Sequence, residues 1–496
     1  MIVEELATQI MQTFGFVPTA DQAKATAVFS RFLLDRDGSS VMIMRGSAGT
    51  GKTSLAAAIV KTLVKLRQRV ILLAPTGRAA KVFSVNAGRP AFTIHRRIYR
   101  QKTFAGESTG FSLNDNMYHD TLFIVDEASM IANGGGGEGA VFGTGCLLDD
   151  MVSFVYGGHN CRMMIIGDMA QLPPVGEEES PALMADFMAG YGLKVYQCDL
   201  NEILRQASGS GTLYNATEIR SMITHDEVTR LPKITFSGFA DIRMVPGGEL
   251  IEQLNSSYSE VGTDETIVIT RSNKRANAYN AGIRGMVLGR EEELTTGDML
   301  MVVRNNYYWT EKAAAEEKAL EDSSTGNGDE RKAESQALPF IANGDRAMVV
   351  RVRNLREFYS LHFADVWLQF PDYDNYEIMV TAVTDSLMAE APALTREQSE
   401  RLFNGVMEDY QDVPLKADRL KKVRQDPCYN ALQIKYAYAV TCHKAQGGQW
   451  AHIYVDQGYM TDDMLSPDYI HWLYTAFTRA TEKLFLVNWP KTQTEG

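Results

Sequence analysis

Mostly apolar runs alternate along the chain with segments that have the composition of helices. Four such runs occur in the first part of the chain, at 41–44, 69–74, 121–125 and 163–166. Each run is short enough to be one strand, and continuous apolar character is typical of strands buried in a parallel sheet. The order of strands and helices therefore predicts an α/β fold.

The same pattern returns near the end of the chain after a long interruption. Later strands are predicted at 265–270, 452–455 and 483–487. Residues 338–385 instead show short alternating runs, which predict a small antiparallel barrel. Residues 310–337 predict a helical or disordered excursion, and residues 390–425 predict an amphipathic helix with a basic end.

These patterns divide the chain into three parts. The first α/β domain covers 1–205 and contains a polar insertion with aromatic residues at 99–120, which we expect to be a β-hairpin. The second α/β domain is built from 206–295 and 430–496. The barrel, with a helical arm, is inserted at 296–429.

Composition and charge restrict the classes of partner and location. The 496 residues carry a net charge of −13, so no global basic field attracts nucleic acid, and any such binding needs a local groove. The 5 cysteines contain no CxxC pair, which favours a reducing compartment over a disulfide framework. The first residues do not have the pattern of a signal peptide, and no apolar run is long enough to cross a bilayer. We therefore expect a soluble, cytoplasmic protein with no membrane partner.

A glycine-rich stretch joins the strand at 41–44 to a helix and matches the phosphate-binding P-loop pattern. Glycines let the backbone curl, so that its N–H groups and the helix N-terminus face phosphate groups. Lys52 adds a positive charge, and the Thr53 hydroxyl can ligand Mg²⁺. The predicted nucleotide-binding residues are Gly46, Ser47, Ala48, Gly49, Thr50, Gly51, Lys52, Thr53 and Ser54.

Acidic and polar residues follow two of the other predicted strands. Asp126 and Glu127 come directly after the strand at 121–125. A carboxylate pair at the end of a strand is what ATP hydrolysis needs, since one carboxylate can hold Mg²⁺ while the other orients or deprotonates water. Asp168 and Gln171 follow the strand at 163–166, where they suit a sensor of the γ-phosphate or are satisfied turn residues.

Three further residues each have two interpretations. Gln22 is either the second half of a helix capping box that begins at Thr19 or a contact for adenine. Arg205 and Arg479 are either members of surface ion pairs or arginines that reach the transition state of phosphoryl transfer.

Taken in order, the motifs resemble those of the superfamily 1 DNA helicases of the 5′-to-3′, RecD-like and Dda-like branch. The matching stretches are the Gln22 region, Gly46–Thr53, Ala74–Ala80, Thr93–His95, Asp126–Ser129, Gly167–Pro174, Arg205–Gln206, Thr441–Gly447 and Tyr474–Arg479. The resemblance implies two RecA-like P-loop NTPase domains, with a β-hairpin inserted in the first and a small Src-homology-type β-barrel inserted in the second. It also implies ATP and Mg²⁺ as cofactors.

The resemblance assigns roles to residues of the nucleotide site. It implies that Gln22 contacts adenine, that Thr53 and Asp126 hold Mg²⁺, and that Gly447 contributes to the nucleotide site. The chain departs from the pattern at Gln449, where many relatives have Glu.

The resemblance also implies catalytic roles. Glu127 would be the catalytic base, Gln171 would sense the γ-phosphate, and Arg205 and Arg479 would be arginine fingers. The implied catalytic residues are Lys52, Asp126, Glu127, Gln171, Arg205 and Arg479.

A third set of residues is implied to contact nucleic acid. The hairpin at 99–120 matches the position of the strand-separating pin of the family, where Phe104 or Phe111 would stack on the terminal base pair. The implied single-strand contacts are Pro75, Thr76, Thr93, His95, Thr441 and His443.

We therefore expect an ATP-dependent helicase, active on single-stranded DNA and at junctions of single and double strands. Its polarity rests on the resemblance alone. Expected partners are single-strand-binding, replication or repair proteins, and we expect a monomer. Two alternatives are an ATP-controlled nucleic-acid binding or remodelling module that does not unwind, and a helicase subunit of a larger recombination or repair complex.

Overall fold

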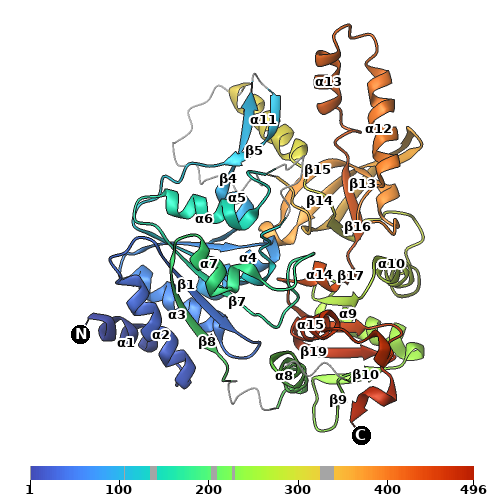
Figure 1. Cartoon of the computed structure of the whole chain (residues 1–496). Coiled ribbons are helices and arrows are strands. Elements are labelled where there is room, and N and C mark those ends of the chain that lie inside the picture. The colour runs from blue at the N-terminus through green and yellow to red at the C-terminus, as the bar shows by residue number, and fades with distance from the viewer. Residues whose placement is uncertain are drawn as a thin grey trace. The chain divides into compact units, whose positions relative to one another are not determined.

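A parallel sheet forms the centre of the first part of the chain (Figure 1). The computed structural model of the protein describes residues 2–104, 107–134, 142–202, 209–225, 230–323 and 340–495. The sheet has the strand order β3-β2-β6-β7-β1-β8, and all neighbouring strands pair in parallel. Its strands are β1 (Ser40–Gly46), β2 (Arg69–Ala74), β3 (Ala91–Thr93), β6 (Thr121–Val125), β7 (Arg162–Gly167) and β8 (Lys194–Leu200).

The strands of this sheet are apolar on both faces because helices cover both. Met42 and Met44 of β1 face one hydrophobic core, and Val41 faces the other. Strand β7 alternates in the same way, with Met164 in the first core and Met163 in the second. All these side chains are fully buried. The strand sequences do not alternate between apolar and polar residues because each face of the sheet packs against its own hydrophobic core.

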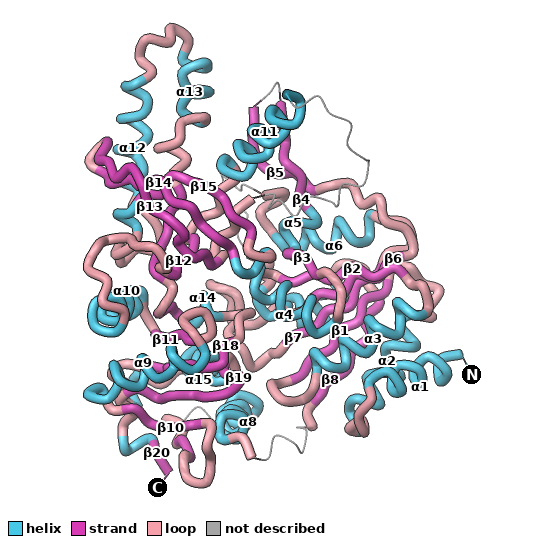
Figure 2. Tube along the Cα trace, turned by 180° about the vertical axis from the view of Figure 1, so that it is seen from behind, coloured by secondary structure: helices cyan, strands magenta, loops and turns pink. Residues whose placement is uncertain are grey.

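Four helices supply the first core and three supply the second. The first set is α1 (Ile2–Phe14), α2 (Ala20–Leu33), α3 (Lys52–Lys65) and α4 (Gly77–Ala87). The second set is α5 (Ile94–Ile98), α6 (Leu147–Gly157) and α7 (Ala185–Gly190). Figure 2 shows α1 beside α2 and α3.

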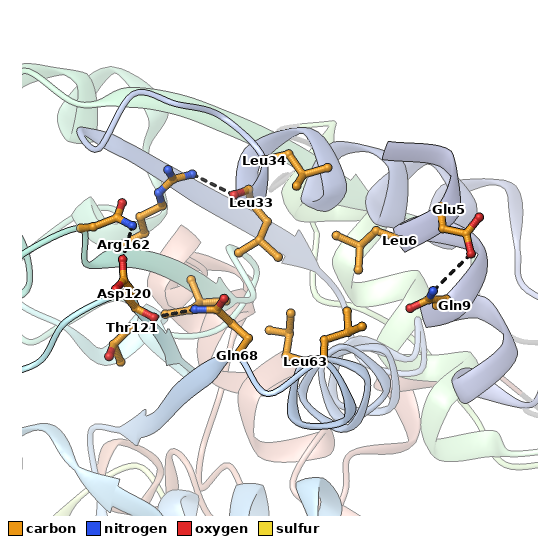
Figure 3. A pocket seen from close by; sticks show the side chains of 13 residues that line it. Glu5, Leu6, Gln9, Leu33, Leu34, Leu63, Gln68, Asp120, Thr121 and Arg162 are labelled. Carbon is orange, nitrogen blue, oxygen red and sulfur yellow. Dashed lines mark hydrogen bonds between the residues drawn. The ribbon is translucent and has the colours of Figure 1, made fainter. Parts of the chain in front are cut away.

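A buried arginine joins the amino edge of the sheet to the end of α2. Arg162, the first residue of β7, donates hydrogen bonds to the carbonyl oxygens of Phe32 at 2.8 Å and Leu33 at 3.1 Å, and to that of Asp35. A helix leaves its last carbonyl groups without partners inside the helix, and a cation stabilises that end. Figure 3 shows Arg162 reaching Leu33, next to a pocket that leucines of α1, α2 and α3 also line.

A β-hairpin interrupts the first sheet in sequence. It consists of β4 (Tyr99–Phe104) and β5 (Glu107–Leu113), which pair antiparallel. The backbone N–H of Asn114 closes its base by donating to the carbonyl of Ile98 at 2.7 Å.

A second sheet and a closed barrel come from the later part of the chain. The sheet has the order β10-β19-β18-β11-β17, and the barrel is β12-β13-β14-β15-β16. The sheet strands are β10 (Ile242–Val245), β11 (Thr266–Thr270), β17 (Ala439–Thr441), β18 (Trp450–Asp456) and β19 (Ala480–Val487). The barrel strands are β12 (Met299–Val302), β13 (Arg346–Phe358), β14 (Leu361–Phe370), β15 (Tyr376–Val383) and β16 (Leu432–Tyr436). A separate two-stranded sheet is formed by β9 (Ile234–Thr235) and β20 (Thr494–Glu495).

The remaining helices connect these strands. They are α8 (Gly211–Thr224), α9 (Leu250–Val261), α10 (Asn273–Gly282), α11 (Tyr308–Ser323), α12 (Arg396–Asp409), α13 (Lys416–Arg424), α14 (Cys442–Ala445) and α15 (Pro467–Phe477). Helices α12 and α13 form the arm expected between barrel strands, and β16 closes the barrel after the arm.

The chain divides into two compact units. The first contains 1–244, 445–451 and 459–496, and the second contains 245–444 and 452–458. The predicted fold class is confirmed, with α/β sheets, an inserted hairpin and an inserted small barrel. The domain boundaries stay a prediction. No helix in the described ranges combines the length and the apolar character required to cross a bilayer.

The contacts of Arg162 lead to a prediction about stability. Arg162→Met keeps much of the apolar stem but removes the guanidinium donor from three carbonyl groups, so we expect the free energy of unfolding to fall by about 1–3 kcal/mol. Urea unfolding measures the change, and Arg162→Lys, which keeps the charge and fewer donors, should give a smaller loss. Equal midpoints for wild type and Arg162→Met would contradict the assignment.

Candidate active site

The P-loop connects β1 to α3 through two glycines in the left-handed backbone region. Gly49 has φ +76° and Gly51 has φ +79°, which favours glycine because a Cβ is unfavourable there. Gly51 is the N-cap of α3 and supplies no side chain to cap it. The first N–H groups of α3 are therefore not taken up by a capping side chain and are available to a ligand.

Neighbouring groups leave no room for a side chain at two glycines of this loop. A Cβ on Gly46 would lie 2.8 Å from Thr50 Oγ1 and 3.0 Å from Lys52 Cγ. A Cβ on Gly49 would lie 2.7 Å from Leu213 Cδ2, which belongs to α8. The glycines thus allow the loop to close on itself and to pack against α8.

Lys52 lies across the loop that precedes it. Its Nζ donates to the carbonyl of Ser47 at 2.9 Å and lies 3.9 Å from Asp168 Oδ2. The ammonium group is thus held at the mouth of the loop, where its charge is available to phosphate oxygens.

The two carboxylates after β6 have different environments. The backbone N–H of Asp126 donates to Leu73 at 3.0 Å, and Asp126 Oδ1 accepts from the N–H of Glu127 at 2.9 Å. Desolvation and the like charge of Glu127 raise the pKa of Asp126 to about 7. Carboxylate oxygens at this position are ligands that suit Mg²⁺. Thr53, with a hydroxyl at the same cavity, could share such an ion.

Glu127 has a backbone conformation that is unusual for a residue with a side chain. Its φ of +53° lies in the left-handed region, which non-glycine residues adopt at a cost of about 1–3 kcal/mol. Its Oε1 lies 3.7 Å from Arg479 Nη1. Strain of this kind is concentrated at functional sites, because the surrounding structure must hold it in place.

Gln171 lies between Glu127 and Arg479. With its amide nitrogen toward Glu127, it donates to Glu127 Oε2 at 3.3 Å and its oxygen accepts from Arg479 Nη2 at 2.9 Å. Arg479 is almost fully buried and also donates to the carbonyls of Thr475 at 3.2 Å and Gly448 at 3.3 Å. The predicted base, sensor and arginine therefore form one hydrogen-bonded group.

These residues surround a cavity of about 420 Å³ in the first unit. That volume is within the range of small-molecule sites. The loop and both carboxylates line it, and the residues of and around α8 that line it are Ser210, Thr212, Leu213 and Ala216. Gln449 and Thr478 also line it.

Two residues at the P-loop were not selected from the sequence. Arg220 of α8 donates from Nη1 to Ser47 Oγ at 2.7 Å, and from Nη2 to Asn201 Oδ1 at 2.6 Å. The hydroxyl of Tyr474, on α15, accepts from the N–H of Ala48 at 2.9 Å. Tyr474 belongs to a stretch that resembles a helicase motif, but no spacing rule in the sequence marks Arg220.

Gln22 forms the capping box and also hydrogen-bonds to the P-loop. Its Oε1 accepts from the N–H of Thr19 at 3.0 Å, and its Nε2 donates to the carbonyl of Thr50 at 2.9 Å. Gln22 is fully buried and is not among the described residues that line the cavity. Gly447 lies against α4, where a Cβ would be 3.0 Å from Thr76 Oγ1. Arg205 lies outside the described residues.

The residues expected to contact DNA have varied surroundings. The Thr76 and Thr93 hydroxyls cap α4 and α5 by accepting from Ala79 and Arg96. Pro75 is half-buried between β2 and this cap.

The aromatic candidates lie at the base of the hairpin. The His95 ring lies 4.9 Å from that of Phe142, and burial lowers the pKa of His95 to about 4. The Phe111 ring also packs on Phe142, at 5.0 Å. The side chain of Phe104 lies outside the described part. In the second unit, Thr441 ends β17 and His443 is exposed on α14.

Comparisons with known proteins agree with this geometry. Residues 19–231 match the AAA domain family, and residues 436–487 match the UvrD-like helicase C-terminal domain family. The chain is 26% identical over 265 residues to the ATP-dependent DNA helicase dda of Enterobacteria phage T4. The aligned region covers 52% of this chain and 55% of that protein. It is 30% identical over 172 residues to the ATP-dependent RecD2 DNA helicase of Deinococcus radiodurans, covering 34% of this chain and 20% of that protein. These matches confirm the resemblance to Dda-like and RecD-like helicases, and the chain spans about half or less of the length of these relatives.

A solved structure is similar over most of the chain. It is a Pif1 helicase from Bacteroides in complex with ADP-AlF3 and single-stranded DNA, with a TM-score of 0.46 and 15% identity. The similarity covers 96% of this chain and 94% of that one.

The packing of Gly49 gives a prediction about the loop. We expect Gly49→Ala to weaken binding of a nonhydrolysable nucleoside triphosphate by about tenfold, since a Cβ in the left-handed region costs about 1–2 kcal/mol and meets Leu213. Adding Leu213→Ala should recover part of the loss by removing the clash. Gly88→Ala is the control, because Gly88 also has a positive φ, +66°, but an added Cβ would meet open space there. Gly88 also lies outside the cavity. That control should bind nucleotide like wild type, and an equal loss in both variants would contradict the role of Leu213.

Proposed function

Because the chain is a relative of the superfamily 1 helicases of the RecD-like and Dda-like branch, we propose that it is an ATP-dependent DNA helicase. In this proposal the protein hydrolyses ATP, moves 5′ to 3′ on single-stranded DNA and unwinds duplex. The observation that carries the proposal is one cavity that combines a P-loop with Asp126, Glu127, Gln171 and Arg479. A P-loop, an acidic pair and a buried arginine together suit hydrolysis of a phosphoanhydride.

The loop binds the phosphate groups of ATP. Its left-handed glycines and the uncapped start of α3 direct N–H groups at the phosphates, and Lys52 adds a positive charge. Thr53 and Asp126 would hold Mg²⁺, which supplies charge neutralisation at the phosphates when it is bound. The adenine contact expected of Gln22 stays a prediction, since its amide already bonds to Thr19 and Thr50.

Glu127 acts on the attacking water. Its carboxylate is the acceptor that takes or orients the water proton, and Gln171 holds it beside Arg479. Arg479 supplies positive charge for the transition state, as an arginine finger does. Arg205 is proposed as a second finger.

Single-stranded DNA is proposed to contact residues of both units. The contacts in the first unit are Pro75, Thr76, Thr93 and His95, and those in the second are Thr441 and His443. Because the pKa of His95 is about 4, its ring is neutral near pH 7 and offers stacking and a hydrogen bond rather than a charge for phosphate. The hairpin β4–β5 is proposed as the pin, with Phe104 or Phe111 against the terminal base pair.

The proposal includes a cytoplasmic location and a monomeric state. Junctions of single and double strands are its proposed substrates, and single-strand-binding, replication or repair proteins are its proposed partners.

Loss of Lys52 tests the ATPase. We expect single-stranded DNA to stimulate ATP hydrolysis by wild type. We expect Lys52→Ala to reduce kcat by at least about a hundredfold, because the variant lacks the positive charge that neutralises the phosphate oxygens. Lys65→Ala removes an exposed lysine from the other end of the same helix and should keep wild-type rates. Hydrolysis that DNA and RNA both leave unchanged would exclude a nucleic-acid motor. Forked substrates with one 5′ or one 3′ tail then report direction.

Shortening the hairpin tests unwinding separately from hydrolysis. Replacing residues 102–110 with an Asn-Gly turn keeps the pairing of Gln101 with Phe111 and keeps Tyr99 and Phe111, which pack at the base on Phe142. We expect this variant to lose duplex unwinding in a strand-displacement assay and to keep DNA-stimulated ATP hydrolysis. Unwinding at the wild-type rate would show that another element separates the strands.

A further inference from the structure

One hydroxyl joins the P-loop to the end of β7. Tyr474 is buried on α15, where its hydroxyl accepts from the N–H of Ala48 at 2.9 Å and donates to Asp168 Oδ2 at 2.7 Å. The tyrosine hydroxyl therefore accepts a hydrogen bond from the loop and donates one to a carboxylate at the same time. All three residues belong to the first unit.

The same carboxylate oxygen also faces Lys52. Asp168 Oδ2 lies 3.9 Å from Lys52 Nζ, whereas Asp168 Oδ1 accepts from the N–H of Ala170 at 3.0 Å. Tyr474 and Lys52 thus share one acceptor. A buried carboxylate without the tyrosine hydroxyl would attract the ammonium group more strongly, because the charge of Asp168 would have one donor fewer.

The attraction of Lys52 to Asp168 competes with its attraction to the terminal phosphates of the nucleotide. The lysine of a P-loop reaches the β- and γ-phosphates. Asp168 lines the same cavity, and its negative charge opposes the most highly charged end of a triphosphate. A diphosphate lacks the terminal phosphate and should be less sensitive to the strength of the pairing between Asp168 and Lys52.

We propose that Tyr474 is a positioning residue that sets the preference of the site for a nucleoside triphosphate over a diphosphate. It does so by holding Asp168 away from Lys52 and by fixing the Ser47–Ala48 peptide. The inference rests on the proposed ATP site, and it adds a specificity role for a residue outside the loop and the acidic pair. It also links α15 to the P-loop through the N–H of Ala48.

The test compares two nucleotides on one conservative variant. Tyr474→Phe removes only the hydroxyl, and the dissociation constants of ATPγS and ADP are measured with Mg²⁺ and without DNA. We expect ATPγS to bind about tenfold more weakly, the effect of losing one hydrogen bond to a charged group, and ADP to change less than twofold. Tyr156→Phe is the matched control, because its hydroxyl donates to Ser40 at 2.9 Å outside the cavity lining.

The two affinities separate positioning from general support of the structure. A selective loss of ATPγS binding in Tyr474→Phe supports the inference. Equal losses for both nucleotides, or wild-type affinity for both, would overturn it. DNA-stimulated hydrolysis by the same wild-type preparation tests the proposed function independently, since the affinities are measured without DNA.

Asp168→Asn is a second variant that tests the inference, and it can be measured even if Tyr474→Phe does not fold. The amide cannot compete as an anion for Lys52, so ATPγS should bind at least as tightly as in wild type, with ADP unchanged. In that background, adding Tyr474→Phe should no longer change the ratio of the two affinities. Weaker ATPγS binding by Asp168→Asn, or an undiminished effect of Tyr474→Phe in that background, would overturn the inference.

Discussion

The site depends on the convergence of parallel strand ends. Strands β1, β6 and β7 are neighbours or near neighbours in one parallel sheet, so the residues that follow them meet at one edge. A loop of N–H groups follows β1, a carboxylate pair follows β6, and Asp168 with Gln171 follows β7. No single segment contains the site, and its groups are held together because the sheet is buried on both faces.

The fold and the centre of the site were largely predictable from the sequence. Both follow from local rules, since apolar runs mark strands and the P-loop needs glycine at φ values such as those of Gly49 and Gly51. Asp126 and Glu127 were recognisable because they end a strand downstream of that loop. The inserted barrel was recognisable from its alternating runs, although its last strand, β16, follows the helical arm.

The parts that sequence reasoning missed depend on tertiary contacts. Arg220 reaches Ser47 from a helix more than a hundred residues further along the chain, and nothing in its local sequence distinguishes it from a surface arginine. Gln22 had two interpretations, and the structure shows that one side chain closes the capping box and reaches the loop carbonyl of Thr50. The neighbour of Phe111 and His95 is Phe142, on a segment after a glycine-rich stretch with no pattern of its own.

The double burial of the first sheet also has a chemical consequence. Its central strands β1 and β7 carry the methionines Met42, Met44, Met163 and Met164, all inaccessible to solvent. A thioether fills such space well, but its sulfoxide is polar and does not return to an apolar core without loss of packing. A methionine oxidised while the sheet is open would therefore hinder repacking of the core until its sulfoxide is reduced. The two cores that position the nucleotide site also protect these sulfur atoms from oxidation.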